Sequence, residues 1–272
     1  MDLSRRTFLK SAASVSACSV FLPACLSPSP SQSETEQWVE RKFAKAMQKK
    51  SFIYQAAHPL ISRDSSNGGL AYDECLFGDS RGIYTKQPVS RVEDISKKST
   101  GGVLPFFHIL NFTDASEDDA AAFRTALDFL VRDLCFRSED LSFTTTELAK
   151  PYIPTMATYG IKENQITWRS LEEAKMIGDG SGFFAPKDHP QGAAYPTMSI
   201  EYKMPDNRFL ELAEISFGAN KGAGFGEERV AMALENRYKC WGDAIPQLKE
   251  AVAREVINGA QLPPGYDIII RA

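Results

Sequence analysis

The segment KGAGFGEER, residues 221–229, combines three alternating glycines with two acids and an arginine. Side chains at Gly222, Gly224 and Gly226 would all project to one face of a strand, so their absence leaves a flat bed of bare backbone. The guanidinium of Arg229 is planar and always charged, which suits stacking on a base or pairing with a phosphate. We predict a strand that forms the floor of a pocket and places Arg229 at the start of a helix.

Two familiar nucleotide motifs do not fit this segment. A P-loop requires a lysine and a hydroxyl residue directly after its last glycine, where this chain has Glu227, Glu228 and Arg229. A dinucleotide fingerprint requires a βαβ unit with an acid about 20 residues further on, and that context is missing. A glycine-rich turn before an ordinary helix remains the alternative.

The elements around this segment are helices mixed with strands. Apolar residues recur at helical spacing in 38–47 and in 123–134, the second run headed by Ser116 as a helix cap, and Ser170 with Glu173 forms a capping-box pattern. Residues 198–204 and 208–217 have strand patterns, and helices are expected over 227–238 and 245–257. Because no regular βαβ rhythm appears, we predict an α+β fold with a largely antiparallel sheet flanked by helices.

The N-terminus has the pattern of a bacterial export signal. Arg5 and Arg6 precede an uncharged run over 11–24 that is too short to span a bilayer. The pattern resembles a twin-arginine signal, and LPAC resembles a lipoprotein site at which Cys25 would be acylated and would anchor the protein to a membrane. We therefore predict an exported, periplasmic or membrane-anchored protein; a chance basic and apolar start on a cytoplasmic protein is the alternative.

The domain boundaries follow from this signal. Residues 1–25 form the signal with its candidate cleavage site, 26–35 a flexible linker, and 36–272 a single domain. The chain has 272 residues and 43% apolar content, which is enough for a full core. Its net charge of -4 argues against electrostatic binding of nucleic acid. Cys75, Cys135 and Cys240 form no CxxC pair, so no zinc site is evident.

Several segments together resemble a known family. The run GAGFGEERVAMALEN resembles motif 3 of class II aminoacyl-tRNA synthetases, in particular the corresponding element of the alanyl enzyme. QPVSRVEDIS and PFFHILNF resemble the two arms of motif 2, and KKSFIYQAAHPLI is similar, more weakly, to motif 1. YGIKENQITWR, MIGDGSG and RFLELAEISF resemble alanyl-type segments that lie between motifs 2 and 3. The resemblance covers about residues 36–236 and implies a class II synthetase-like catalytic core.

The resemblance also implies a site for ATP, Mg²⁺ and an amino acid. By it, Arg91 would bind the α-phosphate, and Glu93 would support the adenine or the amino acid. Phe106 or Phe107 would stack on one face of the adenine, and Arg229 would cover the other face. Gly224 and Gly226 would lie beside the nucleotide, and Glu228 would help hold the metal-bound phosphates. Taken singly, each residue also has a structural explanation: core for the phenylalanines, a surface pair for Arg91 and Glu93, and helix-start charges for Glu228 and Arg229.

Departures from the alanyl pattern bear on the substrate. Gly222 occupies the position of an aspartate that would hold the substrate amine, and Ala213 and Glu214 replace a tryptophan and an asparagine. The segment GVLP, 102–105, replaces the basic residues expected before the motif 2 aromatics. Glu214 could supply the negative charge for an amine, or it could be a solvated strand residue. These changes put alanine as the substrate in doubt.

Two functions follow as alternatives. The first is a stand-alone ligase-like enzyme that adenylates an amino acid or related carboxylate and passes it to a small acceptor. The chain ends soon after the motif 3 segment, and its charge is acidic, so we do not expect specific tRNA charging. The second is an exported pseudoenzyme that uses the pocket to bind a small molecule. A homodimer through the motif 1 region would accord with the resemblance.

Overall fold

The computed structural model describes residues 32–60, 82–185 and 194–260, with the backbone alone for Val92, Glu93 and Ile95. Contacts divide the chain into units Met1–Pro30 and Ser31–Ala272, and the described residues all belong to the second. The predicted signal and Cys25 lie outside the described residues, as does Cys75. Among the helices that the structure describes, none has the length and apolar character needed to span a membrane.

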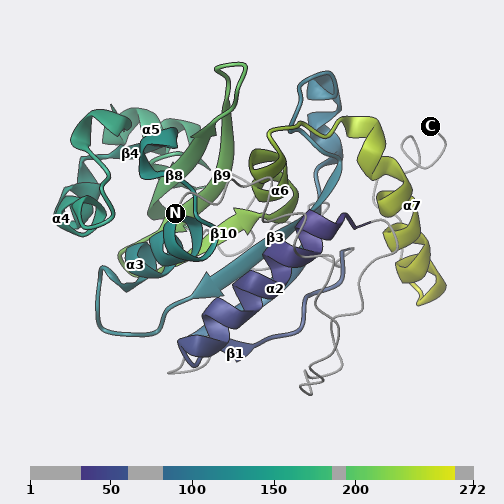
Figure 1. The fold of residues 1–272 in the computed structure, drawn as a ribbon. Helices are drawn as coiled ribbons and strands as arrows, with labels where there is room; N and C mark the ends of the chain where they lie inside the picture. The colour runs from purple at the N-terminus through teal and green to yellow at the C-terminus, as the bar shows by residue number, and fades with distance from the viewer. Residues whose placement is uncertain (1–31, 61–81, 186–193, 261–272) are drawn as a thin grey trace, which may run out of the picture. The chain divides into compact units, whose positions relative to one another are not determined.

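The strands form a sheet with the order β1-β2-β3-β10-β9-β8-β4-β5. The short strand β7 pairs with β8 and, on its other side, with β6. The strand bounds are β1 Ile53–Tyr54, β2 Ile83–Ser90, β3 Phe106–Thr113, β4 Leu141–Thr146, β5 Ile166–Arg169, β6 Asp179–Gly180, β7 Phe183–Phe184, β8 Tyr195–Lys203, β9 Phe209–Ser216 and β10 Gly222–Gly226. Only the outermost pairs, β1 with β2 and β4 with β5, are parallel. The prediction of a largely antiparallel sheet flanked by helices is therefore confirmed (Figure 1).

The helices are α2 Glu34–Lys49, α3 Ala121–Leu127, α4 Ile153–Ala157, α5 Leu171–Ile177, α6 Glu227–Glu235 and α7 Trp241–Ile257, and a π-helical stretch, Asp128–Asp133, continues α3. Several boundaries differ from the sequence predictions: α6 ends at Glu235 and not at Tyr238, and α7 begins at Trp241 and not at Ile245. The helix expected after Ser116 begins only at Ala121, because the Ser116 amide donates instead to Asp114 in a local turn. The linker predicted over 26–35 is wrong at its end, since Ser33 caps α2.

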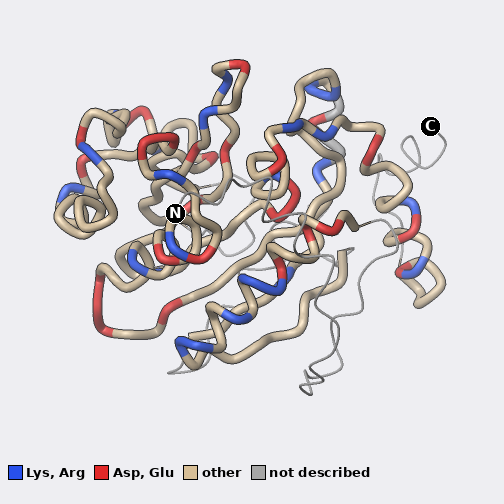
Figure 2. Tube along the Cα trace, in the orientation of Figure 1, with Lys and Arg blue, Asp and Glu red and all other residues tan. Residues whose placement is uncertain are grey.

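Capping explains where α2 and α5 begin. The Ser33 hydroxyl accepts from the Glu36 amide, and the Glu36 carboxylate accepts from the Ser33 amide, which satisfies two otherwise unpaired donors. Ser170 accepts from the Glu173 amide in the same way, so the predicted cap on α5 is confirmed. On α2, Arg41, Lys45 and Lys49 are exposed and Val39, Phe43 and Met47 are buried. Basic positions recur along this helix (Figure 2).

The two faces of the sheet differ in chemistry. One face carries Phe112 of β3, Phe225 of β10 and other large apolar side chains, and α2 packs there through Phe43. The register places Asn111, Gly224, Glu214 and Ser199 side by side on β3, β10, β9 and β8, one residue out of step with the apolar row. Because neighbouring residues of a strand point to opposite faces, the second face is polar.

Candidate functional site

The glycine-rich segment forms strand β10 and passes directly into α6 at Glu227, which confirms the predicted strand and helix. Its three glycines pair with Thr113, Asn111 and Ile109 of β3 and therefore share the polar face. At Gly222, a β-carbon would lie 2.3 Å from the Phe112 carbonyl oxygen. Gly222 is thus required by the close approach of β3 to β10, a structural reason that needs no ligand.

A pocket that contains about 290 Å³ of space, open solvent included, lies at the end of this face where α6 begins. Five of the predicted site residues come together in its lining: Arg91, Phe107, Gly226, Glu228 and Arg229. The other lining residues are Asp94, Gly102, Val103 and Leu104.

Among the residues whose side chains the structure describes, the other predicted site residues are not in this lining. Phe106 is buried in the core with its ring edge against His108, so of the two phenylalanines it is Phe107 that lines the pocket. Gly224 and Glu214 belong to the polar face but do not line this pocket. The backbone of Glu93 lies in the 3-10 helix Val92–Lys97, beside Arg91.

Both arginines of the pocket have carboxylate neighbours. Arg229 donates from Nε to the Gly102 carbonyl at 3.1 Å and from a terminal nitrogen to Glu211 at 3.0 Å. Arg91 Nε lies 3.5 Å from an Asp94 carboxylate oxygen. The two guanidinium groups have side-chain exposures of 53% for Arg91 and 32% for Arg229, so solvent or a ligand can reach both. An anionic ligand could replace Asp94 and Glu211 as the partners of these arginines at small cost, because solvent-accessible ion pairs contribute little stability.

The polar face contains side-chain atoms without partners. Thr85 Oγ1, Asn111 Nδ2 and Thr146 Oγ1 are buried and have no hydrogen-bond partner among the described residues. Such groups usually find a partner, because an unpaired buried donor or acceptor costs free energy. Asn111 lies two strands from Glu214, about 10 Å away, with only the bare backbone of Gly224 between them. This register places a donor and an acid on the two strands that flank the bare backbone of Gly224.

Glu214 is the centre of a second polar cluster. One carboxylate oxygen accepts from the Ser181 amide at 2.8 Å, and the other accepts from the Ser199 hydroxyl, which lies 2.7 Å from the Ser181 hydroxyl. Ser181 has a left-handed backbone with φ 52°, in the hairpin between β6 and β7. Burial, with repulsion from Glu211, raises the pKa of Glu214 to about 8. The solvated-strand interpretation of Glu214 is therefore wrong.

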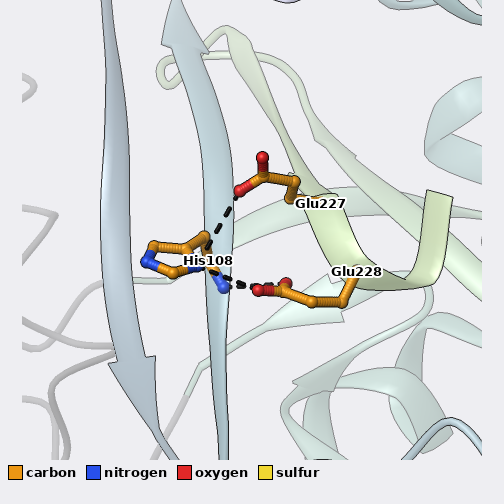
Figure 3. Close-up of side chains that lie close together, drawn as sticks. All are labelled: His108, Glu227 and Glu228. Atoms are coloured by element: carbon orange, nitrogen blue, oxygen red, sulfur yellow. Dashed lines mark hydrogen bonds and ion pairs between the residues drawn. The ribbon is translucent and has the colours of Figure 1, made fainter. Parts of the chain in front are cut away.

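Glu228 faces His108 of β3 (Figure 3). Its two carboxylate oxygens lie 2.9 Å from the His108 backbone amide and from ring atom Nδ1. Burial opposes ionisation of Glu228, but the His108 contacts outweigh it, and the pKa lies below its usual value. Both oxygens of Glu228 thus contact His108, and its role on a phosphate-bound Mg²⁺ stays a prediction. Among the side chains that the structure describes, Asp94 is the other carboxylate in the pocket lining.

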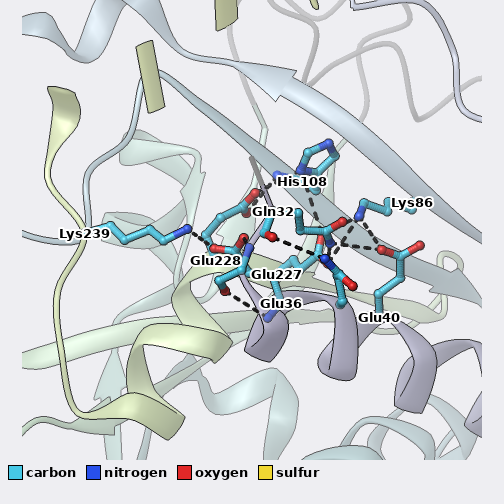
Figure 4. A network of polar contacts seen from close by, with 10 residues as sticks. Gln32, Glu36, Glu40, Lys86, His108, Glu227, Glu228 and Lys239 are labelled. Carbon is cyan, nitrogen blue, oxygen red and sulfur yellow. Dashed lines mark hydrogen bonds and ion pairs between the residues drawn. The ribbon is translucent and has the colours of Figure 1, made fainter. Parts of the chain in front are cut away.

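Glu227, next to Glu228, is fully buried and belongs to a network that joins α2, β2 and α6 (Figure 4). Lys86 donates to Glu40 at 2.6 Å and to Glu227 at 3.2 Å, and Lys239 pairs with Glu36. Burial raises the pKa of Glu227 well above its usual value, against the attraction of Lys86. The pKa of Lys86 lies above its usual value: burial acts to lower it, but the attraction of Glu227 and Glu40 outweighs this effect.

Comparisons with known proteins identify aminoacyl-tRNA synthetases among similar structures. No protein-family model matches the chain, and no curated protein is similar to it. The apo histidyl-tRNA synthetase of S. aureus is 11% identical with a TM-score of 0.45, and the match covers 80% of this chain and 71% of that one. The aspartyl-tRNA synthetase of Entamoeba histolytica is 14% identical, with a TM-score of 0.39 and coverages of 75% and 55%. The pyrrolysyl-tRNA synthetase PylSc of Desulfitobacterium hafniense is 17% identical, with a TM-score of 0.37 and coverages of 74% and 69%. These are distant likenesses in fold.

Sequence reasoning missed the residues whose partners come from distant strands. Strand register places Asn111 opposite Gly224 and Ser199 opposite Glu214. Ser181 joins this cluster through its hydroxyl contact with Ser199. His108 lies in the segment PFFHILNF, whose likeness to motif 2 assigns it no role, although it is the partner of Glu228. One signal was available for Asn111 and Ser199: each is a polar residue that alternates with apolar residues in a buried strand.

Proposed function

We propose that this chain binds ATP together with an amino acid or a related carboxylate on the polar face of the sheet and forms an acyl adenylate. The observation that supports this most is the grouping of Arg91, Phe107 and Arg229 around one pocket. A planar aromatic ring and two cationic groups provide for the two parts of a nucleotide, its base and its phosphates.

The roles follow from the chemistry of these side chains. Phe107 would stack on the adenine with Arg229 on its other face, and Arg91 would neutralise charge at the α-phosphate. A carboxylate oxygen of the substrate would attack the α-phosphorus and form the mixed carboxylic–phosphoric anhydride of an acyl adenylate. The bond between the α-phosphorus and the pyrophosphate oxygen would break at the same time, and pyrophosphate would leave. This reaction needs in-line positioning and charge neutralisation more than a side-chain base. A magnesium ion would accompany the phosphates.

The second substrate would lie on the bed beside this pocket. Asn111 Nδ2 has no partner among the described residues and is a donor for a carboxylate, while Glu214 is an acceptor for an ammonium group. The bare backbone of Gly224 separates them. An amino acid whose two charged groups contact these ends would satisfy the unpaired amide, and its ammonium group would favour the ionised form of Glu214.

A binding protein without catalysis is the second candidate, and a specific observation favours it. Both oxygens of Glu228 are held by His108, and Arg229 is held by Glu211 and Gly102, so two of the expected nucleotide contacts, one to the phosphates and one to the adenine, are already engaged. Together with the proposed export of the protein, away from the main supply of ATP, this would suit a pocket that has kept binding and lost activation.

Pyrophosphate exchange separates the two candidates. The full chain is incubated with ATP, Mg²⁺, labelled pyrophosphate and each amino acid in turn, and ATP affinity is measured by calorimetry. We expect exchange with one amino acid or a few, abolished by Arg91→Ala. We expect Phe107→Ala to weaken ATP binding about 5- to 150-fold, the equivalent of about 1–3 kcal/mol of stacking.

Phe106→Ala is the matched control in the neighbouring position. It removes a buried core ring and should lower the free energy of unfolding by about 3–5 kcal/mol, leaving ATP affinity of the folded protein near that of the wild type. ATP binding without exchange would support the binding protein. No ATP binding at millimolar concentration would refute the nucleotide site.

A further inference from the structure

Three potential metal ligands converge beside the pocket, from β3 and the first turn of α6. His108 Nδ1 lies 2.9 Å from Glu228 Oε1 and 3.8 Å from Glu227 Oε2, and the three ligand atoms all lie within 4.8 Å of one another (Figure 3). Ligands bound tetrahedrally at zinc distances are about 3.3 Å apart. The two separations from His108 Nδ1 lie within about 0.5 Å of this value, so modest side-chain movements would let the three atoms share one ion.

One of these atoms is buried without a hydrogen bond. The Glu227 side chain is 0% exposed. Its Oε1 accepts from Gln32 at 2.6 Å and from Lys86 at 3.2 Å. Its Oε2 makes no hydrogen bond among the described residues, although it lies 2.9 Å from Lys86 Nζ. A cation between Oε2 and His108 would satisfy this oxygen and leave Lys86 bonded to Oε1.

The surrounding charges leave room for a divalent cation. Among the residues that the structure describes in this network, Glu36, Glu40, Glu227 and Glu228 face two ammonium groups, those of Lys86 and Lys239 (Figure 4). When all are ionised, the network has two more negative than positive charges. Their side chains are enclosed, with exposures from 0% for Glu227 to 25% for Lys239, so solvent compensates them poorly. One divalent ion supplies the missing charge.

We propose that His108, Glu227 and Glu228 bind one divalent transition-metal ion, with Zn²⁺ as the best-suited candidate. Imidazole nitrogen with carboxylate oxygen is a donor set for zinc and its neighbours, whereas Mg²⁺ and Ca²⁺ prefer oxygen alone. The His108 side chain is 17% exposed, which allows water to serve as the fourth ligand.

This metal site is separate from any magnesium carried by a nucleotide. It would join β3 to α6, and each of these elements carries one wall of the pocket next to a ligand: Phe107 beside His108, and Arg229 beside Glu228. The bound ion would fix the spacing between these walls, so its role is structural. Its binding is independent of ATP and holds even if the proposed adenylation fails.

The test is zinc binding by the full chain in the absence of nucleotide. Protein stripped with a chelator is titrated with Zn²⁺ by calorimetry, and metal content is measured after desalting. We expect one zinc per chain with micromolar or tighter affinity, and a higher melting temperature in zinc than in chelator. His108→Ala should weaken binding at least tenfold. His58→Ala is the control, because the hydrogen bonds of His58 to Gln87 use only its backbone.

A readout on the unmutated protein covers the case in which His108→Ala does not fold. Loaded with Co²⁺, the wild-type site should give the intense visible absorption of a four-coordinate ion, and added Zn²⁺ should displace it. The proposal is overturned if the wild type retains no metal and melts at the same temperature in zinc and in chelator. It is also overturned if folded His108→Ala binds zinc as the wild type does.

Discussion

Replacing Glu214 by glutamine tests the electrostatics of the polar face. The variant Glu214→Gln keeps the size of the side chain and can still accept from the Ser181 amide and contact Ser199, but it no longer titrates. In the folded wild type, burial raises the pKa of Glu214 from 4.5 to about 8. In the unfolded chain the carboxyl should have its usual pKa, because water surrounds it.

The sign of the effect follows from proton binding. Below about pH 4.5 the carboxyl is protonated in both states, so the stabilising contribution of the neutral group is fully present. As pH rises towards 8, the unfolded chain loses this proton while the folded protein retains it, so the wild type loses stability relative to Glu214→Gln. Above the folded pKa both states are ionised, and the difference becomes constant.

The magnitude is large compared with a protein's net stability. A pKa change from 4.5 to about 8 corresponds to at most about 5 kcal/mol. Because the side chain is only half-buried, solvent reduces this, and we expect a relative loss of at least about 2 kcal/mol between pH 5 and 8.5. Folded proteins are commonly stable by only about 5–15 kcal/mol, so urea unfolding can measure this change.

The assay compares the free energy of unfolding of the wild type and the variant at several pH values, so that all other titrating groups cancel. Glu235→Gln, at an exposed helix position, controls for the removal of one carboxylate. A difference between wild type and Glu214→Gln that stays constant within about 0.5 kcal/mol across this pH range would refute the reasoning. The same profile for Glu235→Gln would show that the effect is not specific to the polar face.

Two further predictions concern the glycine strand and the N-terminus. Gly222→Ala should lower the free energy of unfolding by about 1–3 kcal/mol, because its β-carbon would lie 2.3 Å from the Phe112 carbonyl oxygen. Gly224→Val should instead weaken ATP or amino-acid binding at least tenfold with a smaller loss of stability. Urea unfolding measures the stability of both variants, and calorimetry measures their ligand binding. The prediction is wrong if Gly222→Ala mainly loses binding and Gly224→Val mainly loses stability. We also propose that the protein is exported and acylated at Cys25, so changing Arg5→Lys together with Arg6→Lys should leave it in the cytoplasmic fraction. An unchanged distribution on fractionation would exclude the twin-arginine route.

Local sequence patterns predicted the elements well where one segment contains the whole signal. The passage from β10 to α6 was predicted from KGAGFGEER, because glycine alternation and helix periodicity are properties of neighbouring residues. Capping at Ser170 was predicted for the same reason. The cap at Ser116 was wrong, because a hydroxyl followed by acids also suits a local turn, and packing decides where the helix begins.

The sequence by itself determined which residues could bind an anion and a flat ring, since charge and aromaticity belong to the side chains of Arg91, Phe107 and Arg229. Only the tertiary structure decided which of them meet. Phe106 and Phe107 are neighbours of the same type, and the pleat of β3 sends one into the core and the other to the pocket. Glu214 and Glu228 are both glutamates in the sequence. Burial, with the nearby Glu211, raises the pKa of Glu214, whereas the contacts of His108 from β3 lower that of Glu228, and neither environment can be read from the residue type.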